Sequence, residues 1–119
     1  MMTKDNIYLN IPCKPDYISL VRLTTSAIAS NLNLSIDEIE DIKVSIGEAC
    51  VNVINQKDKE EISIAYEVYD DSLIIRVKDV IEIEEVDAKE LELGLFIIKS
   101  LMDEVKFSEE GIVMIKYIE

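Results

Sequence analysis

The sequence has 119 residues, a formal net charge of −13 and no histidine. Without histidine, a serine–histidine catalytic triad and any histidine-ligated metal site are excluded, and the acidity argues against nucleic acid as a partner, because phosphate backbones are bound by Lys and Arg. Hydrophobic residues make up 49% of the chain, which is enough for one core, and no apolar run approaches the roughly 20 residues that span a membrane. We therefore expect one domain over residues 1–119 and no membrane segment.

The N-terminal stretch and the two cysteines predict a cytoplasmic protein. The first ten residues, MMTKDNIYLN, contain no apolar signal core. Cys13 and Cys50 lie in apolar surroundings without the spacing of metal ligands, which is typical of buried, reduced thiols. The acidic surface suits a basic protein partner, although acidity that serves only solubility would give the same composition.

The first third of the chain predicts a strand followed by a helix. Apolar residues alternate with polar ones from Ile7 to Ile11, and Pro12 ends this strand. Pro15 and Asp16 favour the start of a helix that runs to about Asn31. Its expected buried side consists of Ile18, Val21, Ala27 and Ile28.

The longest predicted helix covers residues 35–56. It begins with a capping box, in which Ser35 and Glu38 each bond the other's free backbone N–H. One turn apart on this helix, Glu48 and Asn52 lie at an edge of its apolar stripe; such a carboxylate and amide can serve a metal–phosphate site, and a solvated Glu–Asn pair is the alternative. The expected buried stripe consists of Ile36, Ile39, Ile42, Ile46, Ala49, Cys50 and Val53.

The second half of the chain predicts two hairpins with a helix between them. Residues 62–69 and 72–79 alternate in hydrophobicity and are joined by a tight turn at Asp70 and Asp71. The acidic stretch that follows begins like a strand end and then resembles a helix start. A third helix is predicted from about Asp87, and residues 106–119 form a second hairpin turned at Glu110 and Gly111. This order predicts an α+β fold, a two-layer α/β sandwich with a mixed, mostly antiparallel sheet and three helices on one face.

Three strings resemble the anti-sigma-factor serine kinases, a branch of the histidine-kinase-like (Bergerat-type, GHKL) ATPases. Residues 37–54, DEIEDIKVSIGEACVNVI, are similar to the first nucleotide-binding box of the family. Residues 93–105, LGLFIIKSLMDEV, resemble its last helix, and residues 22–30, RLTTSAIAS, resemble its first long helix. The resemblance covers nearly the whole chain, and the combination of EAC-x-N with LMDEV is fairly specific to this branch.

The resemblance implies a role for four residues in binding and using Mg-ATP. Glu48 matches the general base that acts on the acceptor hydroxyl or on an attacking water, and Asn52 matches the residue that holds Mg²⁺ against the phosphates of ATP. Asp79 matches the aspartate that accepts a hydrogen bond from the adenine amino group, and Gly94 matches a glycine of the last phosphate-facing loop. Three structural alternatives stay open: Glu48 as a relic or an interface residue, Asp79 as a turn residue, and Gly94 as a close-packing position.

The chain also departs from the family pattern. The family follows its adenine-binding aspartate with Asp-x-Gly-x-Gly, whereas this chain reads DVIEI, with Ile81 and Ile83 at the glycine positions. β-Branched isoleucine resists the positive φ angles that glycine allows. Glu92 and Leu93 precede a single glycine in the second glycine box, the lid loop between the two boxes is short, and Gln56 stands where a histidine is often found. These departures predict weakened ATP binding.

Three functions follow as hypotheses. The first is a serine-protein kinase that sequesters a sigma factor and phosphorylates its antagonist with Mg-ATP. The second is a binding module of the same fold that holds a sigma factor or an antagonist protein without ATP turnover, which the short lid and the DVIEI string favour. The third is an acidic α/β domain with an unrelated partner. The resemblance further implies a homodimer.

Overall fold

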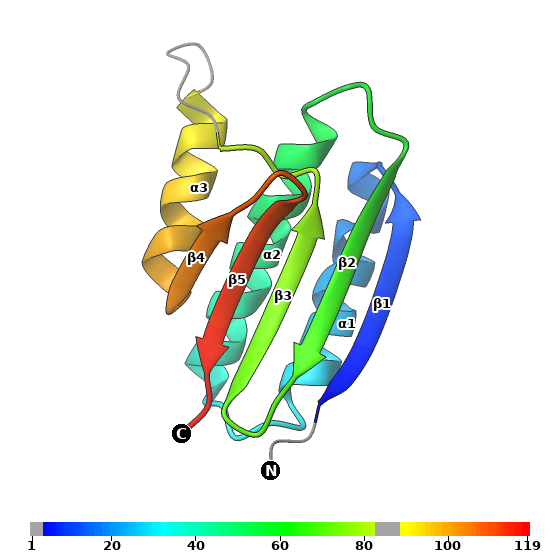
Figure 1. Ribbon diagram of the computed structural model, residues 1–119. Coiled ribbons are helices and arrows are strands. Elements are labelled where there is room, and N and C mark those ends of the chain that lie inside the picture. The colour runs from blue at the N-terminus through cyan, green and yellow to red at the C-terminus, as the bar shows by residue number, and fades with distance from the viewer. Residues whose placement is uncertain (1–3, 83–88) are drawn as a thin grey trace.

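The computed structural model describes residues 4–82 and 89–119, and the predicted order of elements is confirmed (Figure 1). A short 3-10 turn precedes the first helix, and the last two strands form a hairpin. The elements are β1 (Asp5–Pro12), α1 (Ile18–Ala29), α2 (Ile36–Ile54), β2 (Glu61–Val68), β3 (Ser72–Lys78), α3 (Lys89–Leu101), β4 (Glu104–Phe107) and β5 (Gly111–Tyr117).

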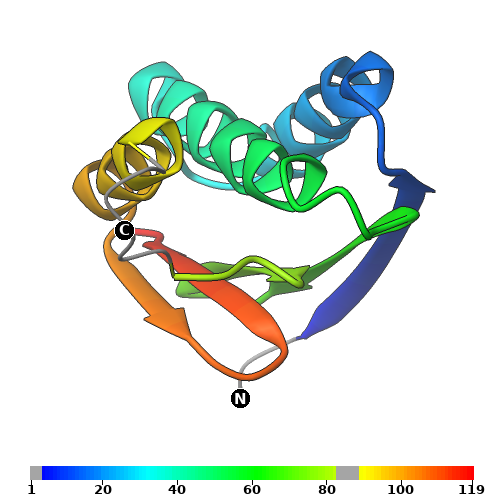
Figure 2. The same cartoon turned by 90° about the horizontal axis from the view of Figure 1, so that it is seen from above.

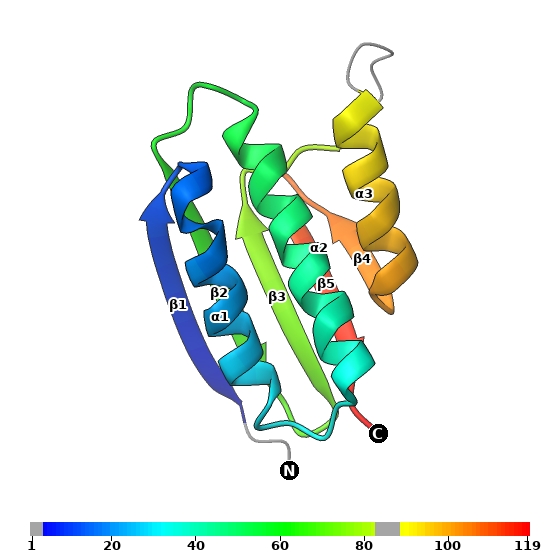
Figure 3. The same ribbon diagram turned by 180° about the vertical axis from the view of Figure 1, so that it is seen from behind.

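The five described strands form one sheet in the order β1-β2-β3-β5-β4. Every neighbouring pair is antiparallel, so the expectation of a mixed sheet is wrong for the described residues. β1 and β2 are antiparallel because α1 and α2, which connect them, run in opposite directions along the sheet. The chain therefore enters β2 beside the end of β1, where Pro12 pairs with Glu61. The three helices cover one face of the sheet, as predicted, and leave the other face open (Figures 2 and 3).

The core lies between the helices and the covered face of the sheet. In the β2–β3 hairpin, alternate residues face the core, because successive side chains of a strand point to opposite faces. Val68 is half-buried, and the fully buried residues of this face are Ile62, Ile64, Tyr66, Leu73, Ile75 and Val77. Tyr66 brings a hydroxyl into this core, where it bonds Thr25 Oγ1 at 2.7 Å. The largest fully buried side chains are Tyr66, Ile42, Ile46, Ile62, Ile64, Leu73, Ile75, Ile98, Ile112, Met114, Val21 and Val53.

The capping box of α2 is confirmed, whereas two residues expected in the core are exposed. The Ser35 hydroxyl accepts from the Glu38 N–H at 3.1 Å, and the Glu38 carboxylate accepts from the Ser35 N–H at 2.9 Å; these bonds hold the pKa of Glu38 below its usual range. Ile36 is 79% exposed, since full burial of α2 begins only at Ile42. Ala27 is also exposed, because the buried positions of α1 follow a four-residue spacing (Val21, Thr25 and Ala29).

The chain leaves the sheet after Lys78. Residues 80–82 are not a strand, which corrects the expectation of a strand end there. The predicted start of the third helix near Asp87 lies outside the described residues, as does Ile83, the second isoleucine at a glycine position of the family. Helix α3 is described from Lys89. None of the described helices combines the length and the apolar character needed to cross a membrane.

Candidate functional site

Two of the four predicted site residues, Glu48 and Gly94, are in contact. They lie on α2 and α3, which pack against each other. A Cβ atom added to Gly94 would lie 2.8 Å from Glu48 Oε2, so the carboxylate rests in space that only a glycine leaves free. Glu48 is half-buried, and its carboxylate has no ion pair with any described residue. This carboxylate is therefore placed between two helices.

Asn52 lies one turn further along α2 and is 2% exposed. Its Nδ2 donates to the backbone oxygen of Ile81 at 3.0 Å, and its Oδ1 accepts from the backbone N–H of Ile81 at 3.1 Å. Oδ1 also accepts from Gln56 Nε2 at 3.1 Å. One buried side chain thus binds both backbone groups of a residue that lies 29 positions away.

Gln56 joins Asn52 to Asp79. Its Nε2 donates to the backbone oxygen of Asp79 at 2.6 Å as well as to Asn52 Oδ1. Sequence analysis noted Gln56 only as a departure from the family pattern and missed this role. The signal that could have found it is the four-residue spacing from Asn52, which places the two amides on one face of the helix.

Asp79 occupies the turn that ends β3 and is fixed through its backbone. Its φ is 69°, its N–H donates to the Glu110 oxygen at 2.7 Å, and its carboxylate lies 3.8 Å from Lys59 Nζ. Aspartate is among the residues that tolerate this left-handed conformation. Ile81 does not have a positive φ in the described structure, so the strain expected at that position does not arise. Its side chain is 47% exposed.

A depression of about 470 Å³ opens beside Asp79. Asp79, Glu82 and Glu109 contribute three carboxylates to its lining, and Lys59 contributes the one cationic side chain among the described lining residues. The Asp79 carboxylate can accept a hydrogen bond from an amino group of a ligand. The excess of negative charge disfavours a group such as a triphosphate.

The arrangement around Asn52 does not fit a magnesium ligand. Mg²⁺ binds oxygen atoms, and an amide oxygen has two lone pairs. At Asn52 Oδ1, one lone pair accepts from Ile81 and the other from Gln56. Among residues 4–82 and 89–119, no group of three or more His, Cys, Asp or Glu residues is placed to hold a metal ion.

The two cysteines are not activated nucleophiles. Burial raises the pKa of the Cys50 thiol to about 12, and burial together with the charge of Asp79 raises the pKa of Cys13. A thiol reacts as its thiolate, so a raised pKa makes each of these cysteines less reactive than an ordinary exposed thiol. Both cysteines are unpaired, as expected; Cys50 is buried, whereas Cys13 is only half-buried, which corrects the expectation that both are buried.

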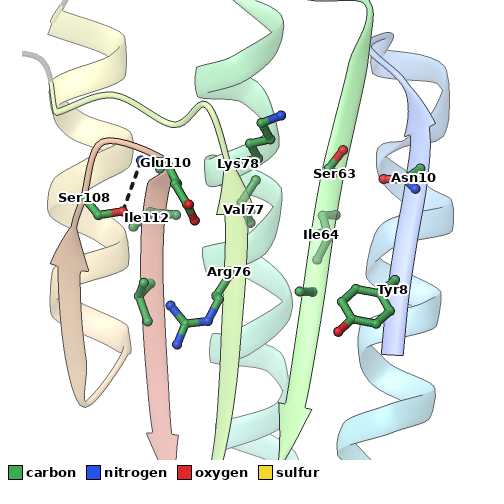
Figure 4. A pocket seen from close by; sticks show the side chains of 13 residues that line it. Tyr8, Asn10, Ser63, Ile64, Arg76, Val77, Lys78, Ser108, Glu110 and Ile112 are labelled. Atoms are coloured by element: carbon green, nitrogen blue, oxygen red, sulfur yellow. Dashed lines mark hydrogen bonds between the residues drawn. The ribbon is translucent and has the colours of Figure 1, made fainter. Parts of the chain in front are cut away.

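A second depression, of about 500 Å³, lies on the open face of the sheet (Figure 4). Tyr8 and Asn10 of β1 and Arg76 and Lys78 of β3 contribute to its lining, and none of the four predicted site residues does. The Arg76 guanidinium is paired with Glu67, with Nε 2.7 Å from the carboxylate. Sequence analysis did not single out this surface, because alternating polar residues on an exposed strand face are ordinary.

Comparison with known proteins extends over almost the whole chain. The profile of the family described as Histidine kinase-like ATPase domain matches residues 11–116. The protein named serine-protein kinase RsbW from Bacillus velezensis is 33% identical over 96% of this chain and 86% of its own length. The protein of the same name from Listeria monocytogenes serotype 4a is 37% identical over 96% and 88%, and that from Bacillus subtilis is 32% identical over 96% and 86%.

These relatives contain residues that this chain lacks. Each alignment spans 138 positions but includes 96% of a 119-residue chain, about 114 residues, so about 24 positions have no counterpart here. This difference agrees with the expectation of a shortened loop.

Proposed function

This chain belongs to the family of histidine kinase-like ATPase domains, and we propose that it is an anti-sigma-factor-type regulator of the serine-protein kinase branch. In this proposal it binds two protein partners, a sigma factor and the antagonist protein that competes for it, and phosphorylates the antagonist on serine. The observation that carries the proposal is the similarity to serine-protein kinases RsbW over 96% of the chain. The acidic surface is suited to basic regions on such partners.

Phosphoryl transfer to a serine needs a group that accepts the hydroxyl proton. Glu48 is the residue we propose for this role, because its half-buried carboxylate faces Gly94 and carries no ion pair to a described residue. Asp79 is proposed to accept a hydrogen bond from the adenine of ATP at the depression that it lines. Gly94 is proposed to keep the space in which the Glu48 carboxylate lies.

A second candidate function keeps the protein partners and lacks ATP turnover. The contacts of Asn52 favour it, since both lone pairs of the amide oxygen are already used within the protein. In this candidate, regulation consists of holding a sigma factor or its antagonist. We also propose a homodimer for both candidates, as the resemblance implies, and light scattering of the purified protein measures it.

The experiment is co-purification of the tagged chain with sigma factors and small antagonist proteins from the genome that encodes it, followed by incubation with ATP. Recovery of one such partner supports the anti-sigma-type regulator, and recovery of none from a complete set contradicts it. A phosphate-affinity gel then separates the two candidates: a shifted antagonist band that Glu48→Gln abolishes supports the kinase. Glu40→Gln, on the exposed side of the same helix, is the matched control and should leave the band unchanged.

A further inference from the structure

We infer that Asn52 holds the segment Asp79–Ile81 against α2 in place of binding magnesium, so that magnesium changes the affinity of this chain for a nucleotide by less than tenfold. The inference rests on the proposed function, since it concerns the nucleotide site of a histidine kinase-like ATPase domain. It runs against what the family resemblance implies for Asn52, and it follows from four hydrogen bonds at the C-terminal end of α2.

The orientation of the Asn52 amide is determined by its partners. Ile81 presents an N–H and a C=O, and Gln56 presents an NH₂ group. If the amide were rotated by 180°, the Asn52 NH₂ would face two donors and its oxygen would face the Ile81 carbonyl. All three hydrogen bonds of the side chain, two to Ile81 and one to Gln56, would then be lost. The oxygen of Asn52 therefore points at the two donors, and neither of its lone pairs is directed at a ligand.

Releasing the Asn52 amide oxygen for a metal ion breaks hydrogen bonds that no other described side chain replaces. Asn52 is 2% exposed, and the backbone groups of Ile81 that it binds are part-buried. A buried backbone group without a partner is costly. Magnesium binding at Asn52 is therefore weakened by at least about tenfold relative to an amide without these partners, because each broken bond of this kind costs about that factor.

The surroundings show what the Asn52–Gln56 pair does. Together the two amides bind the backbone of Asp79 and of Ile81, and Asp79 has the left-handed conformation with φ 69°. The pair thus determines where the Asp79 carboxylate stands at the edge of its depression. Asn52 is a positioning residue for that carboxylate.

The first experiment compares Asn52→Asp with Asn55→Asp by thermal unfolding, each with and without millimolar MgCl₂. Aspartate at position 52 loses the donor to the Ile81 oxygen and places a carboxylate against it, so we expect the melting temperature to fall by several degrees, with no recovery on adding magnesium. Asn55 is exposed and bonds only the Val51 oxygen of its own helix, so Asn55→Asp makes the same charge change with a fall less than half as large. Equal falls, or selective rescue of Asn52→Asp by magnesium, would overturn the inference, since a carboxylate is a good magnesium ligand.

The second experiment uses the unaltered protein and therefore does not depend on the folding of a variant. Calorimetric titration with ATP in MgCl₂ and in EDTA should give dissociation constants within threefold of each other, or no detectable binding in either buffer. A tenfold or greater loss of affinity in EDTA overturns the inference. Partner co-purification without ATP tests the proposed function separately. The failure of the proposed function can therefore be distinguished from the failure of the inference about Asn52.

Discussion

The Asn52 side chain forms a closed pair with the backbone of Ile81: Nδ2 donates to the Ile81 oxygen at 3.0 Å, and Oδ1 accepts from the Ile81 N–H at 3.1 Å. A helix side chain thus supplies to Ile81 the two bonds that a neighbouring strand would supply in a sheet. The chain can consequently leave the sheet after Lys78 without exposing unpaired backbone groups. The end of β3 and the end of α2 are in this way one structural unit.

Replacing Gly94 by alanine should lower phosphoryl transfer without lowering the stability of the fold. The added Cβ meets the end of the flexible Glu48 side chain at 2.8 Å, which can move, and alanine favours a helix over glycine by about 1 kcal/mol. We expect the free energy of unfolding to stay the same or rise by up to about 1 kcal/mol, while any serine phosphorylation that depends on Glu48 falls. Urea unfolding and a phosphorylation assay measure the two effects.

The matched control for this variant is Gly47→Ala. Its Cβ would lie 2.8 Å from the Arg22 guanidinium, which is also the end of a flexible side chain, so it tests the same helix effect without moving the Glu48 carboxylate. If Gly94→Ala keeps full phosphorylation while Glu48→Gln abolishes it, the contact between Glu48 and Gly94 has no part in the reaction.

Replacing Gly111 by alanine should lower the free energy of unfolding far more than Gly94→Ala or Gly47→Ala. Gly111 begins β5 with φ +151°, and a Cβ there would lie 2.2 Å from the backbone oxygen of Val77. A backbone atom within a sheet cannot move aside, so strain and clash together should remove about 2–4 kcal/mol from the free energy of unfolding. The midpoint of urea unfolding measures this loss, and a change similar to that of Gly94→Ala would contradict the close approach of the two strands.

Removing the cap of α2 should lower stability moderately. Ser35→Ala deletes the hydroxyl that accepts from the Glu38 N–H at 3.1 Å, and loss of such a cap costs about 1 kcal/mol. The control is Ser19→Ala in the first turn of α1, for which we expect no loss because alanine is the better helix former. Comparable losses for the two serines in chemical unfolding would contradict the capping box.

Stability should fall in alkaline solution because two buried acids resist ionisation. Burial raises the pKa of Cys50 from 9.0 to about 12 and that of Tyr66 from 10.0 to about 12. The folded state then holds protons that the unfolded state has lost, so the free energy of unfolding is undiminished below pH 9 and decreases above it. The slope should be about 1.4 kcal/mol per pH unit above pH 9 from Cys50, with a similar further slope above pH 10 from Tyr66.

Urea unfolding at pH 8, 10 and 11 measures this dependence. Cys50→Ala and Tyr66→Phe each remove one titrating group, so each should flatten its own part of the curve. Tyr66→Phe should also cost about 1 kcal/mol at pH 8, because the 2.7 Å bond between Thr25 and the Tyr66 hydroxyl is lost. If the stability of both variants falls with pH as steeply as that of the unaltered protein, the assignment of the alkaline loss to Cys50 and Tyr66 is contradicted.

Local patterns predicted the elements, and long-range contacts account for the errors. The β2–β3 hairpin and the Ser35 cap were predictable, because strand alternation and capping depend on residues close in sequence. The exposure of Ile36 was not, since periodicity cannot tell where along a helix the sheet ends. The end of β3 at Lys78 was predicted to within one residue, but the bond from Asn52 to the backbone of Ile81, 29 residues away, was not.

At the candidate site, too, local patterns predicted some features, and long-range contacts determine the others. The pairing of residue types at Glu48 and Asn52 came from helical spacing, but their proposed roles came from the family resemblance and remain predictions. The contact between Glu48 and Gly94 joins two helices, and no local pattern reports such a contact. Gln56 was noticed as a substitution, yet its bond to the Asp79 backbone depends on the path of the chain after β3.

The most direct measurement of the central claim is the NMR spectrum of the Asn52 side-chain amide in the ¹⁵N-labelled protein. We predict that its NH₂ signal is protected from solvent exchange and keeps its position when MgCl₂ is added in the presence of ATP. The exposed Asn55 amide, which bonds only the Val51 oxygen, should exchange faster. A magnesium-dependent shift of the Asn52 signal, accompanied by a shift of the Ile81 backbone amide, would contradict the claim that Asn52 holds Ile81 and not a metal ion.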